Sequence, residues 1–108
     1  MKVRHIPAAW HENLYWITIE ALNNALKHAQ ARKMTIEIHA TPKQVELAVT
    51  DNGRGFSPSK VVPGGMGLET MRARARQLGG EVTIESEPGK GTCVRFRATI
   101  KAEQDEQH

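Results

Sequence analysis

The hydrophobic positions of the chain predict two amphipathic helices. Between residues 10 and 29, apolar side chains recur every three or four positions and form one stripe, which contains Leu14, Ile17, Ala21, Ala25 and Ala29. Residues 67–78 repeat this pattern with Leu68, Met71, Ala75 and Leu78. Gly79 and Gly80 follow, and glycine is typical of a helix end. We therefore expect each helix to present one face to a core.

Four other stretches alternate apolar and polar positions, which is typical of strands with one buried face. They cover residues 35–39, 45–50, 82–85 and 94–100, and the apolar members that face the expected core are Ile36, Ile38, Val45, Leu47, Val49, Val82, Ile84, Val94, Phe96, Ala98 and Ile100. Residues 41–43 supply a turn between the first two strands, and residues 3–5 are a candidate edge strand. The pattern predicts an α+β fold: a two-layer α/β sandwich whose mixed, mostly antiparallel sheet is covered on one face by the helices.

Length and composition indicate one small domain. The chain has 108 residues, of which we expect 1–100 to form the domain and 101–108 a flexible tail. The single cysteine, Cys93, excludes an intrachain disulfide and a cysteine-rich zinc site. Fifteen basic and twelve acidic residues give a net charge of +3, which is too small an excess to indicate a nucleic acid partner. No apolar run approaches the roughly 20 residues that cross a bilayer, and we expect a cytoplasmic location.

One polar face of the first helix carries candidate chemistry. Glu20 and Asn24 are four residues apart, Lys27 is three further on, and together they occupy an arc of about 60° beside the apolar stripe. Asn24 is a candidate ligand for Mg²⁺, an ion that keeps most of its waters and also binds substrate phosphates. Lys27 is a candidate phosphate-binding residue, and Glu20 is a candidate general base. A solvated helix face is the alternative interpretation of this spacing.

An acidic residue and two glycines follow the second predicted strand, in the segment Asp51-Asn52-Gly53-Arg54-Gly55. An ionised carboxylate only accepts hydrogen bonds. Asp51 is therefore suited to bind the exocyclic amine of adenine, and it would meet another acceptor if guanine were bound. Gly53 and Gly55 permit close approach of a ligand. A glycine-rich hairpin turn is the alternative interpretation.

Two further glycine-rich segments adjoin predicted elements. Gly65 and Gly67 precede Leu68 at the start of the second helix, where exposed backbone N–H groups favour anions such as phosphate. A flexible loop that ends in a helix cap has the same composition. Residues 88–92 precede the last strand and are typical of a turn, although the hydroxyl of Thr92 could also reach a base or a bridging water.

The order and spacing of these segments resemble the GHKL ATPase superfamily, which includes gyrase B subunits, heat-shock chaperones, MutL and histidine kinases. Residues 20–28 resemble its N box, residues 51–55 its G1 box, residues 65–68 its G2 box, and residues 89–92 the glycine–threonine motif before the last strand. The resemblance extends over residues 10–100. Residues 27–28, 67–75, 78–80 and 86–92 resemble more closely the histidine kinases of the nitrate-sensor type.

The resemblance implies a Bergerat fold that holds ATP or ADP, with Mg²⁺, between the first helix, the sheet and a lid of about residues 57–66. It implies Glu20 as the catalytic residue, Asn24 as the metal ligand, and a nucleotide site made of Asn24, Lys27, His28, Asp51, Gly53, Gly55, Gly65, Gly67, Leu68 and Thr92. His28 would flank the adenine, and a partly buried helix histidine is the alternative. The implied protein partners are the dimerisation and phosphoacceptor domain of a parent kinase and, indirectly, a response regulator. We expect the isolated domain to be monomeric.

A histidine kinase also needs a phosphoacceptor histidine on a separate helical hairpin, for which the chain has no room. His11 and Glu12 superficially resemble the acceptor motif, but they lie on the predicted helix that carries Glu20, only nine residues before it. We therefore expect a catalytic fragment with little autophosphorylation of its own. Two alternatives share the motifs: a serine kinase of the anti-sigma-factor type, and a nucleotide-binding module without phosphotransfer. Lys27 and the arginine-rich second helix favour the histidine kinase over the first, and Glu20 argues against the second.

Overall fold

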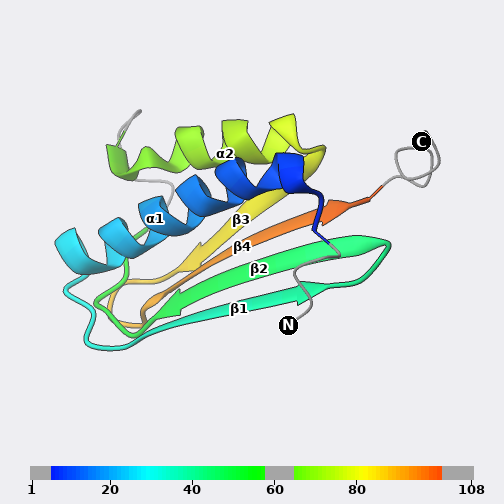
Figure 1. Ribbon diagram of the computed structural model, residues 1–108. Coiled ribbons are helices and arrows are strands. Elements are labelled where there is room, and N and C mark those ends of the chain that lie inside the picture. The colour runs from blue at the N-terminus through cyan, green and yellow to red at the C-terminus, as the bar shows by residue number, and fades with distance from the viewer. Residues whose placement is uncertain (1–5, 58–64, 101–108) are drawn as a thin grey trace.

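The computed structural model describes residues 6–57 and 65–100, whose arrangement is shown in Figure 1. Two helices lie side by side on one face of a four-stranded sheet. The predicted two-layer α+β sandwich is therefore confirmed. The candidate edge strand at residues 3–5, most of the predicted lid and the predicted tail lie outside the described residues.

Both helices occupy the stretches that their apolar stripes predict. Helix α1 spans His11–Lys27 and follows a 3-10 turn at Ala8–Trp10, so the predicted range of residues 10–29 is one residue too long at its start and two at its end. Helix α2 spans Leu68–Gln77 and follows a 3-10 turn at Gly65–Gly67. The whole predicted stripe of α1 is buried. Burial of these stripes against the sheet is what stabilises helices of this length.

The sheet consists of β1 (Met34–Ala40), β2 (Gln44–Asp51), β3 (Gly80–Ser86) and β4 (Thr92–Thr99). Their order across the sheet is β1-β2-β4-β3, and all three pairings are antiparallel. Within the described strands the sheet is therefore antiparallel throughout, in agreement with the predicted, mostly antiparallel sheet. β1–β2 and β3–β4 are both hairpins, and β4 pairs antiparallel with β2. Helix α2 thus connects β2 to β3, which run parallel with β4 between them.

The core lies between the helices and the sheet. Its largest fully buried side chains come from both layers: Phe96, Ile17, Leu47, Met71 and Val45. Trp10 packs edge-on against Phe96, with ring centroids 6.4 Å apart. This edge-to-face arrangement is favourable for aromatic rings, and it anchors the start of α1 to β4.

Strand β1 departs from the predicted burial. Ile36 and Met34 are 47% and 36% exposed, although the alternation of this strand predicts that Ile36 faces the core. Helix α1 packs against β2, and α2 packs against β3. Figure 1 shows β1 at the edge of the sheet beyond α1. The apolar face of β1 is therefore only partly covered, because neither helix extends across it.

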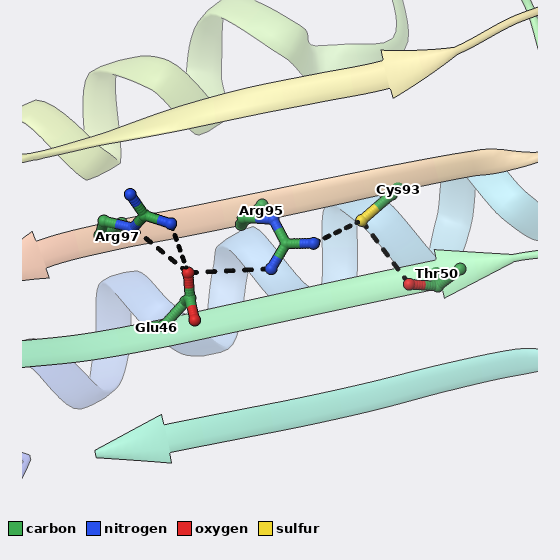
Figure 2. Close-up of polar contacts among 5 residues, drawn as sticks. All are labelled: Glu46, Thr50, Cys93, Arg95 and Arg97. Carbon is green, nitrogen blue, oxygen red and sulfur yellow. Dashed lines mark hydrogen bonds and ion pairs between the residues drawn. The ribbon is translucent and has the colours of Figure 1, made fainter. Parts of the chain in front are cut away.

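The face of the sheet opposite the helices carries charged side chains, and Figure 2 shows its central cluster. Oε2 of Glu46 on β2 accepts hydrogen bonds from Nη2 and Nε of Arg97 on β4, at 2.8 and 3.2 Å. Nη1 of Arg95 lies 3.8 Å from the same oxygen. The hydrogen bond from Arg97 lowers the pKa of Glu46, the charges of Arg97, Arg95 and His39 lower it further, and burial acts in the opposite direction.

We expect Glu46→Gln to lower the melting temperature at pH 7 and to lose this effect in acid. A carboxylate whose pKa is lowered by folding stabilises the fold above its ordinary pKa, and the stabilisation disappears as the pH falls through the folded value. The difference in Tm between the two proteins should be constant well above the ordinary carboxyl pKa of about 4.3 and should close as the pH falls through and below that value. Exposed ion pairs contribute at most about 1 kcal/mol, so the difference in Tm should be small. Because salt screens exposed charges, this difference should shrink further in 1 M salt.

Thermal denaturation across this pH range measures the effect. Arg97→Gln is the matched variant, since it removes the other partner of the same hydrogen bonds. The double variant should be little less stable than either single one. A difference that widens in acid would contradict the role assigned to Glu46.

Candidate functional site

The candidate site lies at one end of the sheet, where three strands begin or end with polar side chains. Asp51 is the last residue of β2 and is paired in register with Thr92, the first residue of β4. Ser86 is the last residue of β3 and is paired with Thr92 from the other side. Antiparallel pairing therefore brings together residues that are far apart in the sequence.

Helix α1 adds an amide to this end of the sheet. Asn24 and Thr92 are each only 9% exposed, and within the described residues they are the two buried polar side chains. Both line one small pocket between α1 and the sheet, with these other residues: Ala21, Ala29, Asp51, Phe56, Leu68 and Val94. A few polar groups placed among apolar side chains in one pocket, here beside a carboxylate, are typical of a binding site.

The space enclosed by these side chains is small, at about 10 Å³. This volume is about that of a single water site. A planar base would fit only if the wall formed by α1 and Phe56 moved away from the strand ends. The arrangement of polar groups is thus present, while its opening must widen to admit a ligand.

The carboxylate of Asp51 is oriented by its own loop. Its Oδ1 accepts a hydrogen bond of 2.7 Å from the backbone N–H of Gly53. A Cβ atom at Gly53 would lie 2.5 Å from the Cβ of Ala29, so only glycine allows the loop to cross the end of α1 so closely. The structure thus gives Gly53 a packing role against Ala29, just beyond α1, and Ala29 also lines the pocket.

The same loop is held to the segment that follows α1. The backbone N–H and the Nε of Arg54 donate to the carbonyl oxygens of Ala29 and His28, at 3.0 and 2.9 Å. Oδ1 of Asn52 accepts the backbone N–H groups of Arg32 and Lys33 at 3.0 and 2.9 Å. Asn52 belongs to the motif that the sequence singled out, but its role as the anchor of this loop needed the structure.

Gly55 and Gly91 join the loop to the turn before β4. Gly55 has a φ of +68°, and a Cβ atom there would collide with the carbonyl oxygen of Glu87. The N–H of Gly89 donates to the carbonyl of Arg54. Gly91, with a φ of +81°, passes equally close to the backbone of Asp51. The two glycine-rich segments therefore form one continuous wall beside the pocket.

Glu20 lies one helical turn before Asn24 and contacts the start of α2. A Cβ atom built on Gly67 would lie 2.5 Å from Cδ and 2.8 Å from Oε1 of Glu20. Gly65 belongs to the 3-10 turn before α2, and Leu68 lines the pocket. The structure thus brings Glu20, Asn24, Asp51, Leu68 and Thr92 into one region.

Lys27 and His28 do not line this pocket. Both are exposed at the C-terminal end of α1, where the N–H of His28 caps the helix by donating to the carbonyl of Asn24. The carbonyl of His28 holds Arg54, so the contribution of His28 in this structure is made by its backbone. The Glu20–Asn24–Lys27 face predicted from helical spacing therefore runs from the pocket out to solvent.

We expect Gly67→Ala to destabilise the protein more than Gly79→Ala, which is the matched control. Both glycines have a left-handed φ, at +64° and +73°, so both substitutions carry the backbone penalty of about 1–2 kcal/mol. Nothing lies within 4 Å of the control position, whereas the new methyl at Gly67 would displace Glu20. Because only the end of the flexible Glu20 side chain has to move, the second effect should stay below the roughly 1–3 kcal/mol that overpacking costs in a well-packed core.

Thermal denaturation should show a slightly larger fall in Tm for Gly67→Ala than for Gly79→Ala. Equal losses at the two positions would mean that Glu20 is not held by this contact.

Comparison with known proteins identifies the class to which this site belongs. The family model of the histidine kinase-, DNA gyrase B- and HSP90-like ATPases matches residues 11–103. The chain therefore belongs to this ATPase family, and the resemblance predicted from its motifs is confirmed.

Among individual proteins, similar chains are bacterial sensor kinases. The chain is 33% identical over 111 residues to the sensor protein VraS of Staphylococcus haemolyticus, covering 97% of this chain and 32% of VraS. It is 36% identical over 93 residues to the sensor histidine kinase LiaS of Bacillus subtilis, covering 86% of this chain and 26% of LiaS. The chain thus spans about a third or less of the length of these relatives.

Two solved structures have the same fold. The histidine kinase domain of the blue-light activated histidine kinase EL346 of Erythrobacter litoralis superposes with a TM-score of 0.67 at 26% identity, over 80% of this chain and 42% of that one. The ATP-binding domain of PrrB from Mycobacterium tuberculosis superposes with a TM-score of 0.68 at 24% identity, over 84% of this chain and 69% of that one.

Two features are absent from the described residues. None of the helices in residues 6–57 and 65–100 is long and apolar enough to cross a membrane. In the same residues, no three side chains of histidine, cysteine, aspartate or glutamate are grouped so that they could hold a metal ion.

Proposed function

We propose that this chain is the ATP-binding catalytic domain of a sensor histidine kinase, and that it transfers the γ-phosphoryl group of ATP to a histidine on a dimerisation domain outside the chain. The observation that carries the proposal is the pocket at the end of the sheet, where Asn24, Asp51 and Thr92 come together from three elements. The names of the similar sensor proteins agree with it.

The base of the nucleotide is assigned to the strand ends. Asp51, held through one oxygen by Gly53, presents an acceptor to the exocyclic amine of adenine. Apolar side chains of the pocket, such as Phe56 and Val94, are suited to a planar base. The phosphates of the bound nucleotide would extend from the base pocket toward the N-terminus of α2. Gly65 and Gly67, which lie next to that N-terminus, would offer them backbone N–H groups.

The residues on the pocket side of α1 fit a magnesium ion that is bound mainly through phosphates. Asn24 would supply one amide oxygen, with phosphate oxygens and water as the other ligands, and the ion would offset the negative charge of the phosphates. Lys27 and His28, exposed at the end of the same helix, are assigned to the phosphates and to the edge of the base.

Glu20 is assigned the role of general base, which accepts or directs the proton of the attacking group. Its carboxylate lies beside Gly67, one turn of α1 from Asn24, and so adjoins the phosphate side of the pocket. His11 is unsuited to be the acceptor in the same chain. Thirteen residues of helix separate it from Asn24, which corresponds to about 20 Å along the helix axis.

Calorimetric titration and a transfer assay test the proposed function. We expect binding of ATP and ADP by the monomeric chain, stronger with Mg²⁺ present than after its removal by a chelator. For the transfer assay, the chain replaces the matching segment of LiaS, and the rest of LiaS supplies the dimerisation domain. We expect acid-labile label from ATP on the histidine of that domain, and we expect a response regulator to take up the label from it. In the cell, this transfer would take place in the cytoplasm. Stable label on a serine would support the serine kinase alternative instead.

A further inference from the structure

Ser86, which lies behind the pocket, connects three segments of the site. Its Oγ accepts a hydrogen bond of 2.8 Å from the backbone N–H of Phe56. The same oxygen lies 3.0 Å from the carbonyl oxygen of Gly91 and 2.8 Å from Oγ1 of Thr92. One hydroxyl thus contacts the loop after β2, the turn before β4 and a residue that lines the pocket.

The hydrogen atoms in this group can be arranged in one consistent way. Ser86 has a single hydroxyl proton, and the carbonyl of Gly91 can only accept. At 3.0 Å these two oxygens would repel each other unless Ser86 donates its proton to Gly91. Ser86 then has none left for Thr92, so Thr92 must donate its own proton to Ser86.

This arrangement decides what Thr92 offers to the pocket. With its proton directed to Ser86, Thr92 presents only lone pairs to a ligand. Its neighbour in register is Asp51, whose carboxylate also only accepts. The end of the pocket therefore presents two adjacent acceptors, which favour a ligand that donates hydrogen there and disfavour one that presents a carbonyl.

We propose that Ser86 is a specificity-determining residue that acts through Thr92: by engaging the proton of Thr92, it makes the pocket select a purine with an amino group over a purine with a carbonyl group at the same position. The inference rests on the proposed function, because it takes the pocket to be the adenine site. Ser86 itself is a positioning residue and does not touch the base.

The test compares ATP with inosine triphosphate, which replaces the exocyclic amine with a carbonyl. Calorimetry gives the ratio of the two Kd values for each variant. We expect Ser86→Ala to reduce the preference for ATP about five- to tenfold, as befits the energy of one neutral hydrogen bond. In that variant the hydroxyl of Thr92 can rotate and donate to the carbonyl. Ser86→Thr keeps the hydroxyl, so this variant should retain most of the preference for ATP over inosine triphosphate.

Coupling between the two residues separates this role from a purely structural one. Thr92→Val alone should also reduce the preference for ATP, and adding Ser86→Ala to it should change the ratio no further. Should Ser86→Ala fail to fold in thermal scans, Thr92→Val and Ser86→Thr still decide the matter. Loss of affinity for both nucleotides by the same factor, or an unchanged ratio in Thr92→Val, would overturn the inference.

The outcome for the unsubstituted protein distinguishes the two proposals. If it binds neither nucleotide, the proposed function fails and this inference fails with it. If it prefers ATP and Ser86→Ala keeps the full preference, only the inference fails.

Discussion

Glutamine in place of Glu20 is expected to reduce phosphoryl transfer to the acceptor histidine by roughly a hundredfold or more, with the affinity for ATP largely kept. General base catalysis accounts for about 10²–10⁴ in rate, and an amide cannot accept the proton. In the proposed complex the strand ends and α1 hold the nucleotide, where Asn24, Asp51 and Thr92 line the pocket, so the substitution should act on the chemical step alone. Transfer rates under single-turnover conditions, with binding measured separately, give both quantities.

Glu12→Gln is the matched control for this prediction. Glu12 is an exposed carboxylate in the first turn of the same helix, two turns before Glu20, and its substitution should leave transfer unchanged. A Glu20→Gln protein that transfers phosphate at the original rate would remove Glu20 from the catalytic role. A fall in transfer matched by an equal fall in ATP affinity would assign it to binding instead.

Without an acceptor domain, the chain should bind ATP and acquire little label of its own. Phosphoryl transfer depends on a nucleophile placed in line with the γ-phosphate, and His11 is at the far end of α1 from the pocket. Strong acid-labile label on the chain alone that disappears in His11→Ala would overturn this assignment.

Asparagine in place of Asp51 is expected to weaken ATP binding by about 1.5–3 kcal/mol, or roughly ten- to a hundredfold in Kd. The new amide oxygen can keep the hydrogen bond from Gly53, which directs the NH₂ group toward the pocket. Two donors, the amide and the adenine amine, then face each other. The loss should therefore be specific to adenine, and binding of inosine triphosphate should fall less or improve.

Calorimetry with ATP and inosine triphosphate measures this change of preference. Glu85→Gln makes the same chemical replacement on an exposed residue of β3 and should alter neither Kd. Equal weakening of both nucleotides in Asp51→Asn would mean that the carboxylate stabilises the loop and does not bind the base.

The fold was predictable wherever burial follows local periodicity. The stripe of α1 and the alternation of β2 and β4 are recorded in residues three, four or two positions apart, and the structure buries them as expected. Ile36 shows where this reasoning fails. Its alternation with polar neighbours is as regular as that of Leu47, yet it is exposed, because burial of a strand also requires a helix above it. No pattern within β1 reports how far α1 extends across the sheet.

The sequence alone identified the chemical groups of the site. They are a carboxylate after a strand, an amide on a helix face and the glycines beside them, and these groups keep their chemistry in any arrangement. Which of these groups meet was decided by the tertiary structure. The pairing of Asp51 with Thr92 joins residues 41 positions apart, and the contact of Gly67 with Glu20 depends on how α2 lies beside α1. Helical spacing placed Glu20, Asn24 and Lys27 on one face, but only packing showed that this face runs from a buried pocket to solvent. Ser86 has no signal of its own in the sequence, because its role comes from three oxygen and nitrogen atoms that the sheet register and two turns bring within reach of one hydroxyl.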